Sequence, residues 1–237
     1  MNSKITMTFL FLNLLNITAQ ATIYVGFSDP QTGDKALAVI TSGPIDKVDK
    51  IVSAQKDKGL IGWSGAGRVS PLADKMIFKM MNEKESASAI EAAIEAKYPN
   101  DYYRLLFITP TGEMGSIVPK NGCPDLECGK REAADFAVIG GGLEDMVLEK
   151  TWDEFYLLKV QTEKQTACKM LEILNFITTI GGEKKPFTSA QIIVDSPKLD
   201  QLLRANSFKG IFKTSENKII QKLRDDLSAS GVICSPM

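Results

Sequence analysis

The order of strand-like and helix-like segments is the feature that most limits how this chain can fold. Stretches rich in β-branched and aromatic residues flank turn clusters in two hairpin patterns, residues 22–41 and 102–118. Apolar residues spaced three and four apart predict helices over further stretches, which are 71–82, 86–97, 159–180 and 215–228. Strand pairs followed by helices predict a layered α+β protein, with two sheets face to face and helices outside them.

Three shorter apolar segments add strands to this pattern. They begin at Gly59, Phe136 and Thr188, and the first two run into glycine clusters. The chain has no internal repeat, no low-complexity tract and no linker-like composition. The sequence therefore predicts a single domain over residues 22–237.

Residues 1–21 have the pattern of a secretory signal peptide. Lys4 gives the positive start, residues 5–17 are mostly apolar, and Ala19-Gln20-Ala21 supplies the small-x-small pattern that signal peptidase requires. The apolar run is too short to span a bilayer. We therefore expect an exported protein, periplasmic or extracellular and not held in a membrane, whose mature chain begins at Thr22.

Histidine is absent from the 237 residues, and this narrows the chemistry. A serine or cysteine nucleophile activated by histidine is excluded, and so is histidine-ligated zinc. The 28 basic and 29 acidic residues leave a net charge of -1, which gives no general attraction for nucleic acid. We expect no metal, no cofactor and no nucleic-acid partner.

Four cysteines suit the disulfide chemistry of an exported protein. Cys123 and Cys128 flank a Pro-Asp-Leu-Glu loop, and we expect them to pair with each other. For Cys168 the plainest interpretation is a small apolar residue on a helix, and its pairing with Cys234 stays open.

Thr22 would carry both parts of a nucleophilic device once it is the N-terminal residue. A threonine hydroxyl is a weak nucleophile until a base takes its proton, and the free α-amine of the same residue serves as that base. The reference pKa of an α-amine is about 7.7–8.0, so part of it is neutral near physiological pH. This device needs no histidine.

A glycine-rich turn after the strand that begins at Gly59 is a candidate for binding an oxyanion. The backbone amides of Gly65, Ala66 and Gly67 precede a predicted helix, where amides commonly bind anions. A tight strand-to-helix connection explains the same residues equally well.

Several motifs together resemble the bacterial family called domain of unknown function 1028. Thr-Ile-Tyr-Val-Gly-Phe-Ser-Asp-Pro-Gln-Thr-Gly from Thr22 is similar to that family's Thr-Phe-Ser-Ile-Val-Ala-Arg-Asp-Pro-x-Thr-Gly opening. Phe-Ala-Val-Ile-Gly-Gly-Gly-Leu from Phe136 is similar to its Tyr-Ala-Val-Gln-Gly-Asn-x-Leu. Gly-Gly-Glu-Lys-Lys-Pro-Phe-Thr-Ser-Ala from Gly181 is similar to its Gly-Gly-Asp-x-Arg-Gly-x-Gln-Ser-Ala. These matches run in order over nearly the whole mature chain.

The resemblance implies a four-layer αββα sandwich of the N-terminal-nucleophile hydrolase type, because the family is placed with those enzymes. It aligns Thr22 with the family's first threonine. By a looser likeness to threonine proteases of that superfamily, Lys50, or Lys47, would be the lysine that lowers the pKa of the nucleophile. The implied substrate is a small amide-containing molecule of unknown identity.

The departures from the family motifs leave two functions open. Ser28 stands in place of arginine, Ile139 in place of glutamine and Gly141 in place of asparagine. Pro186 and Thr188 replace a glycine and a glutamine. One function is amide hydrolysis through Thr22, and the other is a non-catalytic binding or interaction protein with a degenerate site. The oligomeric state is left open.

Overall fold

The structure, a computed structural model, describes residues 22–42, 51–65, 71–99, 103–118, 127–181, 187–207 and 216–235. It has mixed α and β structure with two antiparallel sheets, so the predicted α+β class is confirmed. The larger sheet has the strand order β10-β9-β2-β1-β8-β7 and the smaller one the order β3-β4-β5-β6. The strands are β1 (Thr22–Ser28), β2 (Lys35–Thr41), β3 (Val52–Gln55), β4 (Gly59–Gly65), β5 (Tyr103–Ile108), β6 (Met114–Ile117), β7 (Glu127–Glu132), β8 (Phe136–Leu143), β9 (Ser189–Asp195) and β10 (Leu203–Ser207).

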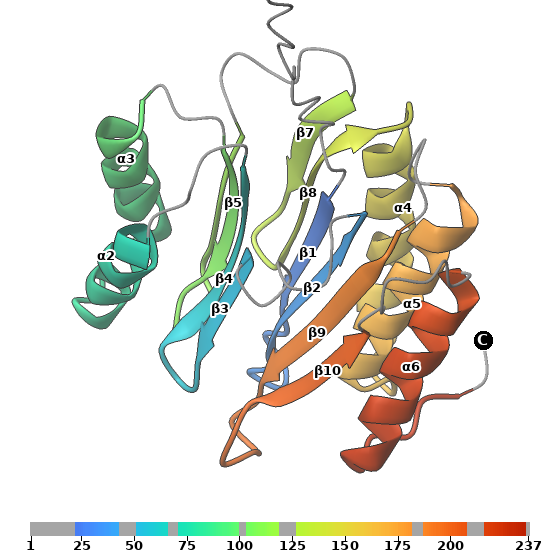
Figure 1. Cartoon of the computed structure of the whole chain (residues 1–237). Helices are drawn as coiled ribbons and strands as arrows, with labels where there is room; N and C mark the ends of the chain where they lie inside the picture. Colours follow the sequence, from blue (N-terminus) through green and yellow to red (C-terminus); the bar gives the residue numbers. More distant parts are fainter. Residues whose placement is uncertain are drawn as a thin grey trace, which may run out of the picture.

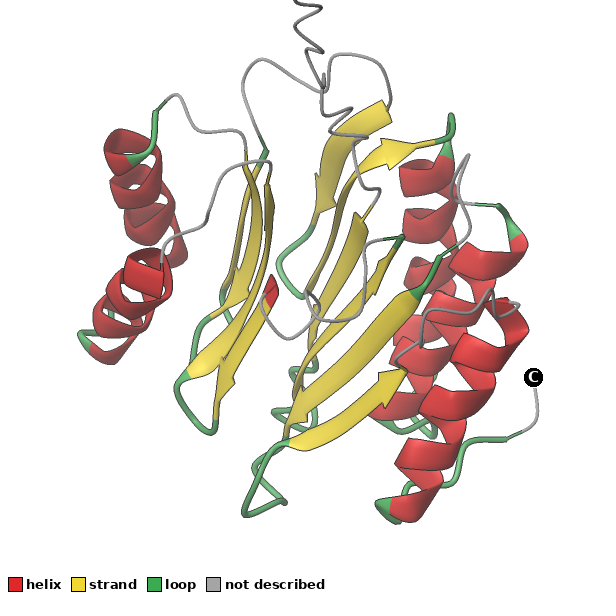
Figure 2. Ribbon diagram, viewed as in Figure 1, coloured by secondary structure: helices red, strands yellow, loops and turns green. Residues whose placement is uncertain are grey.

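Helices cover the outer face of each sheet, as Figures 1 and 2 show. On the smaller sheet they are α2 (Pro71–Asn82) and α3 (Ala87–Lys97), and on the larger sheet α4 (Val147–Lys159), α5 (Thr166–Thr179) and α6 (Glu216–Ala229). The inner faces of the two sheets pack against each other through β1, β2 and β8 on one side and β4, β5 and β6 on the other. Apolar side chains fill all three interfaces.

The first hairpin forms as predicted and lies in the middle of the larger sheet. β1 pairs with β2 on one side and with β8 on the other, so its backbone is hydrogen-bonded along both edges. The turn is closed by Asp29, whose Oδ1 accepts a hydrogen bond from the backbone N–H of Gln31 at 2.9 Å, and Gly33 adopts φ 75°. The second hairpin, β5 and β6, also forms where the sequence predicts it.

The predicted helix over 159–180 is wrong in its first part. Lys159 ends α4, and α5 begins only at Thr166 after a turn. The sequence pattern also missed α4 itself, as well as the strands β3, β7 and β10, whereas it located α2, α3 and α6 to within two residues. β8 does not end at the glycine triplet but continues through it to Leu143. Glycine suits this part of the strand, because neighbouring side chains occupy the space beside Gly140 and Gly141.

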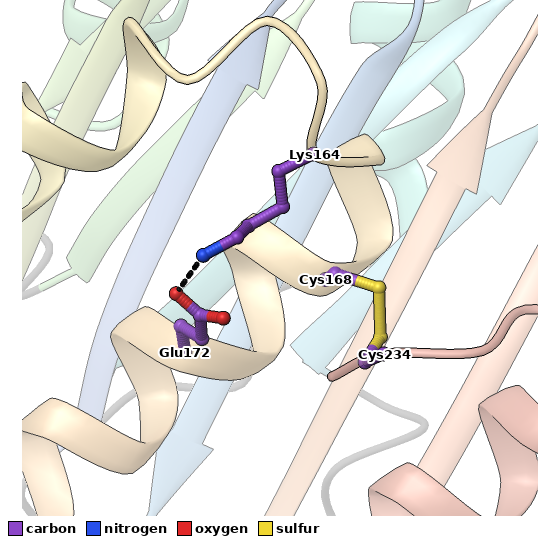
Figure 3. The surroundings of a disulfide bond; sticks show 4 residues. All are labelled: Lys164, Cys168, Glu172 and Cys234. Atoms are coloured by element: carbon purple, nitrogen blue, oxygen red, sulfur yellow. Dashed lines mark hydrogen bonds and ion pairs between the residues drawn. A yellow bond between two sulfur atoms is a disulfide. The ribbon is translucent and has the colours of Figure 1, made fainter. Parts of the chain in front are cut away.

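A disulfide joins Cys168 on α5 to Cys234 in the tail that follows α6 (Figure 3). Cys168 is buried on its helix as expected, but it is a bridge residue rather than a free apolar one. The closed loop has a sequence separation of 66 residues, for which chain-entropy models give about 4 kcal/mol of stabilisation. Cys128 is also disulfide-bonded, but Cys123 lies outside the described residues, so the Cys123–Cys128 pairing stays a prediction. Within the described ranges, no helix is both long and apolar enough to cross a membrane.

Candidate active site

The side chain of Thr22 points into the space between the two sheets. Alternate residues of a strand face opposite sides. Tyr24, two residues further on β1, faces the smaller sheet, since its ring lies 2.6 Å from the point where a Cβ on Gly62 would be. Phe27, on the other face, packs against Phe155 of α4 with ring centroids 5.4 Å apart. Thr22 lies two residues before Tyr24 and therefore faces the same way, toward the smaller sheet. It is 3% exposed.

Two further hydroxyl residues lie in line with Thr22 on one side of it, across the larger sheet. The Oγ1 atoms of Thr22 and Thr41 lie 2.9 Å apart, across the β1–β2 register. Ser189 on β9 is the next residue across, opposite Thr41. Its hydroxyl is fully buried and has no hydrogen-bond partner among the described residues. The start of β1 therefore lies beside buried groups that donate and accept hydrogen bonds.

Arg104 brings a positive charge to the same end from the opposite sheet. The residue is 5% exposed, on the inner face of β5. A Cβ on Gly141 would lie 2.1 Å from its Nη1 and 2.8 Å from Cys128 Sγ, so the guanidinium occupies the space that a side chain at 141 would need. Gly141 is the β8 residue directly opposite Thr22.

Tyr24 and Ser64 continue this polar lining along the sheets. Burial raises the pKa of the Tyr24 hydroxyl far above its ordinary value, against the opposing effects of Ser64, the Arg104 charge and the Trp63 backbone. Tyr24 is therefore a neutral hydroxyl at physiological pH. Ser64 precedes Gly65, the last residue of β4, so the backbone of Gly65 lies at the same end of the sheets as Thr22.

The other predicted site residues are not placed. Ala66, Gly67, Lys47 and Lys50 lie outside the described residues, so their roles stay predictions from the sequence and the resemblance. Arg104 is the residue that the sequence analysis missed. Its signal was available, since Tyr-Arg-Leu-Leu-Phe-Ile puts one charge into an otherwise apolar strand.

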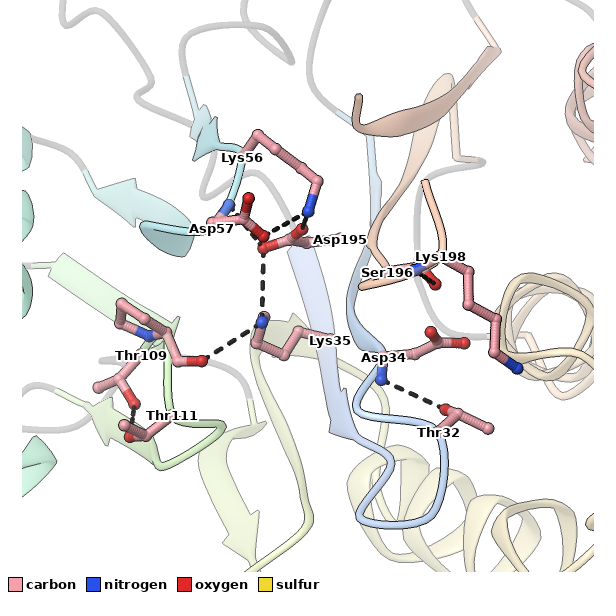
Figure 4. A network of polar contacts seen from close by, with 11 residues as sticks. Thr32, Asp34, Lys35, Lys56, Asp57, Thr109, Thr111, Asp195, Ser196 and Lys198 are labelled. Carbon is pink, nitrogen blue, oxygen red and sulfur yellow. Dashed lines mark hydrogen bonds and ion pairs between the residues drawn. The ribbon is translucent and has the colours of Figure 1, made fainter. Parts of the chain in front are cut away.

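The opposite end of the inter-sheet space is held by an ion-pair cluster, shown in Figure 4. Asp195, at the end of β9, is fully buried. Its carboxylate lies 3.6 Å from Lys35 Nζ and 3.0 Å from Lys56 Nζ, and it accepts a hydrogen bond of 3.1 Å from the backbone N–H of Asp57. Lys35 also donates to the carbonyl of Pro110 at 3.3 Å. This Asp195 cluster joins β2 and β9 to two turns of the smaller sheet.

A separate open groove of about 650 Å³ lies between β3 and α2. Ser53 donates a hydrogen bond to Asp74 there, and burial raises the pKa of that carboxyl. None of the residues around Thr22 lines this groove. Within the described residues, no group of three or more potential metal-binding side chains is found.

Comparison with known proteins gives a match in fold only. No family model and no curated protein matches the sequence. A crystal structure of a Silicibacter pomeroyi protein of the domain of unknown function 1028 family is similar with a TM-score of 0.72 and 14% identity, over 90% of each chain. The structure of eukaryotic HslV from Trypanosoma brucei gives a TM-score of 0.42 and 11% identity, over 73% of this chain and 98% of that one, which is too distant to bear on the fold. The likeness to the domain of unknown function 1028 family, inferred from motifs, is thus supported by the fold.

Proposed function

We propose that this chain is an exported amide hydrolase with a four-layer αββα sandwich of the N-terminal-nucleophile type, in which Thr22 is the nucleophile. One observation carries the proposal: Thr22 begins a central strand and directs its hydroxyl inward, 2.9 Å from the hydroxyl of Thr41. Removal of residues 1–21 places the α-amine on that same residue. The Cys168–Cys234 disulfide suits an oxidising compartment.

The reaction follows from the groups that Thr22 and its neighbours supply. The neutral α-amine takes the proton from Oγ1 as that oxygen attacks the amide carbonyl. The tetrahedral intermediate collapses when the C–N bond breaks, and the leaving amine takes the proton back from the ammonium group. Water, deprotonated by the same α-amine, then cleaves the ester and releases the carboxylic acid and free Thr22. Thr41 orients the attacking oxygen, and amides from Gly65 to Gly67 stabilise the oxyanion.

The test is covalent labelling of the exported chain. The full sequence is expressed with its leader, and intact mass spectrometry identifies the mature N-terminus. A serine β-lactone, which acylates N-terminal nucleophiles by ring opening, is then added. We expect one adduct at Thr22, none in Thr22→Ala, and a retained adduct in Thr22→Ser, which keeps both hydroxyl and amine. A chain that begins at any other residue would falsify the mechanism.

The second candidate function, a binding protein on the same fold, is favoured by Ile139. This fully buried apolar residue stands opposite Tyr24, at the position where the resemblance expects a glutamine. Its presence removes one polar group from the inner face of β8. A mature protein that begins at Thr22 and resists every β-lactone would support binding without catalysis.

A further inference from the structure

In this chain, Arg104 from the smaller sheet takes the place of a polar side chain that the family motif would put on β8. The motif has asparagine where this chain has Gly141. Glycine at this point leaves the space that the Arg104 guanidinium fills, since any Cβ there would lie 2.1 Å from Nη1. The absence of a side chain at position 141 therefore makes room for the guanidinium of Arg104.

Arg104 lies close enough to Thr22 to act on a substrate there. Gly141 and Thr22 are directly opposed in the β1–β8 register. Cβ positions of opposed residues are about 4.5–5.5 Å apart, which puts Arg104 Nη1 within about 8 Å of the Thr22 Cβ position. That distance is the length of a short substrate group adjoining the attacked carbonyl.

The chemistry of this site favours an anionic group. Among the described residues at this end, Thr22, Thr41, Tyr24 and Ser64 contribute neutral hydroxyls, and Arg104 contributes a positive charge. A guanidinium presents a rigid fork of N–H donors that matches the two oxygens of a carboxylate. Because burial weakens the screening by water, a charge here acts more strongly on a substrate than one at the surface.

We infer that Arg104, seated against Gly141, is a specificity-determining residue that binds a carboxylate on the acyl part of the substrate, next to the amide that Thr22 attacks. This inference rests on the proposed function for the place of the reaction. It identifies the substrate class as amides of dicarboxylic acids or of acidic amino acids. It also explains the departure at position 141 as a changed specificity rather than a decayed site.

The experiment compares two probes that differ in one charge. N-succinyl-serine β-lactone carries a carboxylate, and N-succinamoyl-serine β-lactone carries a carboxamide of the same size. For the mature protein we expect the second-order labelling rate to be at least about tenfold higher with the carboxylate probe. In Arg104→Met the two rates should become equal, and in Arg104→Lys part of the preference should remain. Arg204→Met is the matched control, because it removes the same charge at the Asp195 end, where Arg204 donates to the carbonyl of Ala54.

A second readout separates this inference from the proposed function. Thr22→Ala cannot be acylated, so its affinity for unreactive serinamide analogues of the two probes reports binding alone. A carboxylate preference that disappears in the Thr22→Ala, Arg104→Met double variant supports the subsite even where labelling fails and the hydrolase proposal falls. Equal labelling of Thr22 by both probes overturns the subsite and leaves the hydrolase standing. Equal affinity for both analogues overturns it as well, and circular dichroism of each variant excludes loss of fold as the cause.

Discussion

The two ends of the space between the sheets are built from different chemistry. At one end Asp195 is paired with two lysines and a backbone amide, so charges there are matched within the fold. At the other end Thr22, Thr41 and Ser189 present buried hydroxyls, and Arg104 adds a positive charge. β2 connects the two, with Lys35 at its first residue and Thr41 at its last.

Together with the proposed function, this difference predicts separate roles for the two ends of the inter-sheet space. A buried ion pair with several hydrogen bonds fixes the geometry of the chains it joins, and removal of one partner is costly. A neutral hydroxyl contributes less to stability than a buried charge, so removing one of the hydroxyls at the Thr22 end should cost less than removing the Asp195 carboxylate. We therefore expect substitutions at the Asp195 end to change stability and substitutions at the Thr22 end to change reactivity.

The largest effect on stability is expected from Asp195→Asn. The change leaves Lys35 buried without its carboxylate, and the free energy of unfolding should fall by about 3–5 kcal/mol. Urea denaturation measures it, and the labelling rate of the folded fraction should be unchanged. Asp200→Asn, an equal change of charge at an exposed residue, is the control. Loss of stability below about 1 kcal/mol would contradict the structural role of the Asp195 cluster.

Gly141→Ala should affect both stability and reactivity, because it disturbs the contact between the two sheets at the Thr22 end. The new Cβ displaces the Arg104 guanidinium and presses on Cys128, with a cost of about 1–3 kcal/mol. The preference for the carboxylate probe should disappear. In Gly129→Ala, by contrast, the new Cβ meets only a Leu148 methyl at 3.3 Å, so both properties should change little. If Gly141→Ala keeps its preference for the carboxylate probe, Arg104 does not bind the carboxylate.

Thr41→Val tests the hydroxyl that lies beside Thr22, the proposed nucleophile. Valine keeps the shape and removes the partner of Thr22, so the labelling rate should fall about tenfold while stability changes by roughly 1 kcal/mol. Thr109 and Thr111 form the matched pair at the Asp195 end, also with hydroxyl oxygens 2.9 Å apart. Thr109→Val should leave the rate as it is. If the labelling rate falls by a similar factor in Thr41→Val and Thr109→Val, the Thr22 end and the Asp195 end do not differ in reactivity.

The smallest effect concerns alkaline stability. Because burial raises the pKa of Tyr24 in the folded state, the folded chain keeps a proton that the unfolded chain loses above about pH 10. The contribution of Tyr24 to stability is therefore complete below pH 10 and declines as the pH rises beyond it. Tyr24→Phe should flatten that decline, whereas Tyr156→Phe, at an exposed tyrosine, should not. Denaturant titrations at a series of pH values measure the slope.

Local patterns in the sequence predicted much of the fold. The β1–β2 hairpin has β-branched residues on both strands and a turn that begins with Asp29-Pro30. For α3, Ser86 accepts a hydrogen bond from the backbone N–H of Ala89 at 3.2 Å, the capping that the sequence indicated. α4 was missed because Met146, at φ 65°, precedes it without a side-chain cap and because exposed Leu157 obscures its apolar face.

The site was only partly predictable, for a physical reason. Thr22 became the candidate nucleophile through the signal-peptide pattern and the motif resemblance, and that role stays a prediction. The approach of Arg104 to Gly141 depends on how the two sheets pack, and that of Lys35 to Asp195 depends on the pairing of β2 with β9, two strands far apart in the sequence. No local pattern encodes either contact. The Cys168–Cys234 bridge likewise joins segments that are brought together by the packing of α5 against α6.

The most direct test of the account is a crystal structure of the mature chain after reaction with N-succinyl-serine β-lactone. We predict continuous density from Thr22 Oγ1 to an acyl carbon between the sheets, with a free α-amine on the same residue and the succinyl carboxylate against Arg104. An unmodified Thr22 beside an adduct elsewhere, or a peptide bond still joining Thr22 to Ala21, would contradict it.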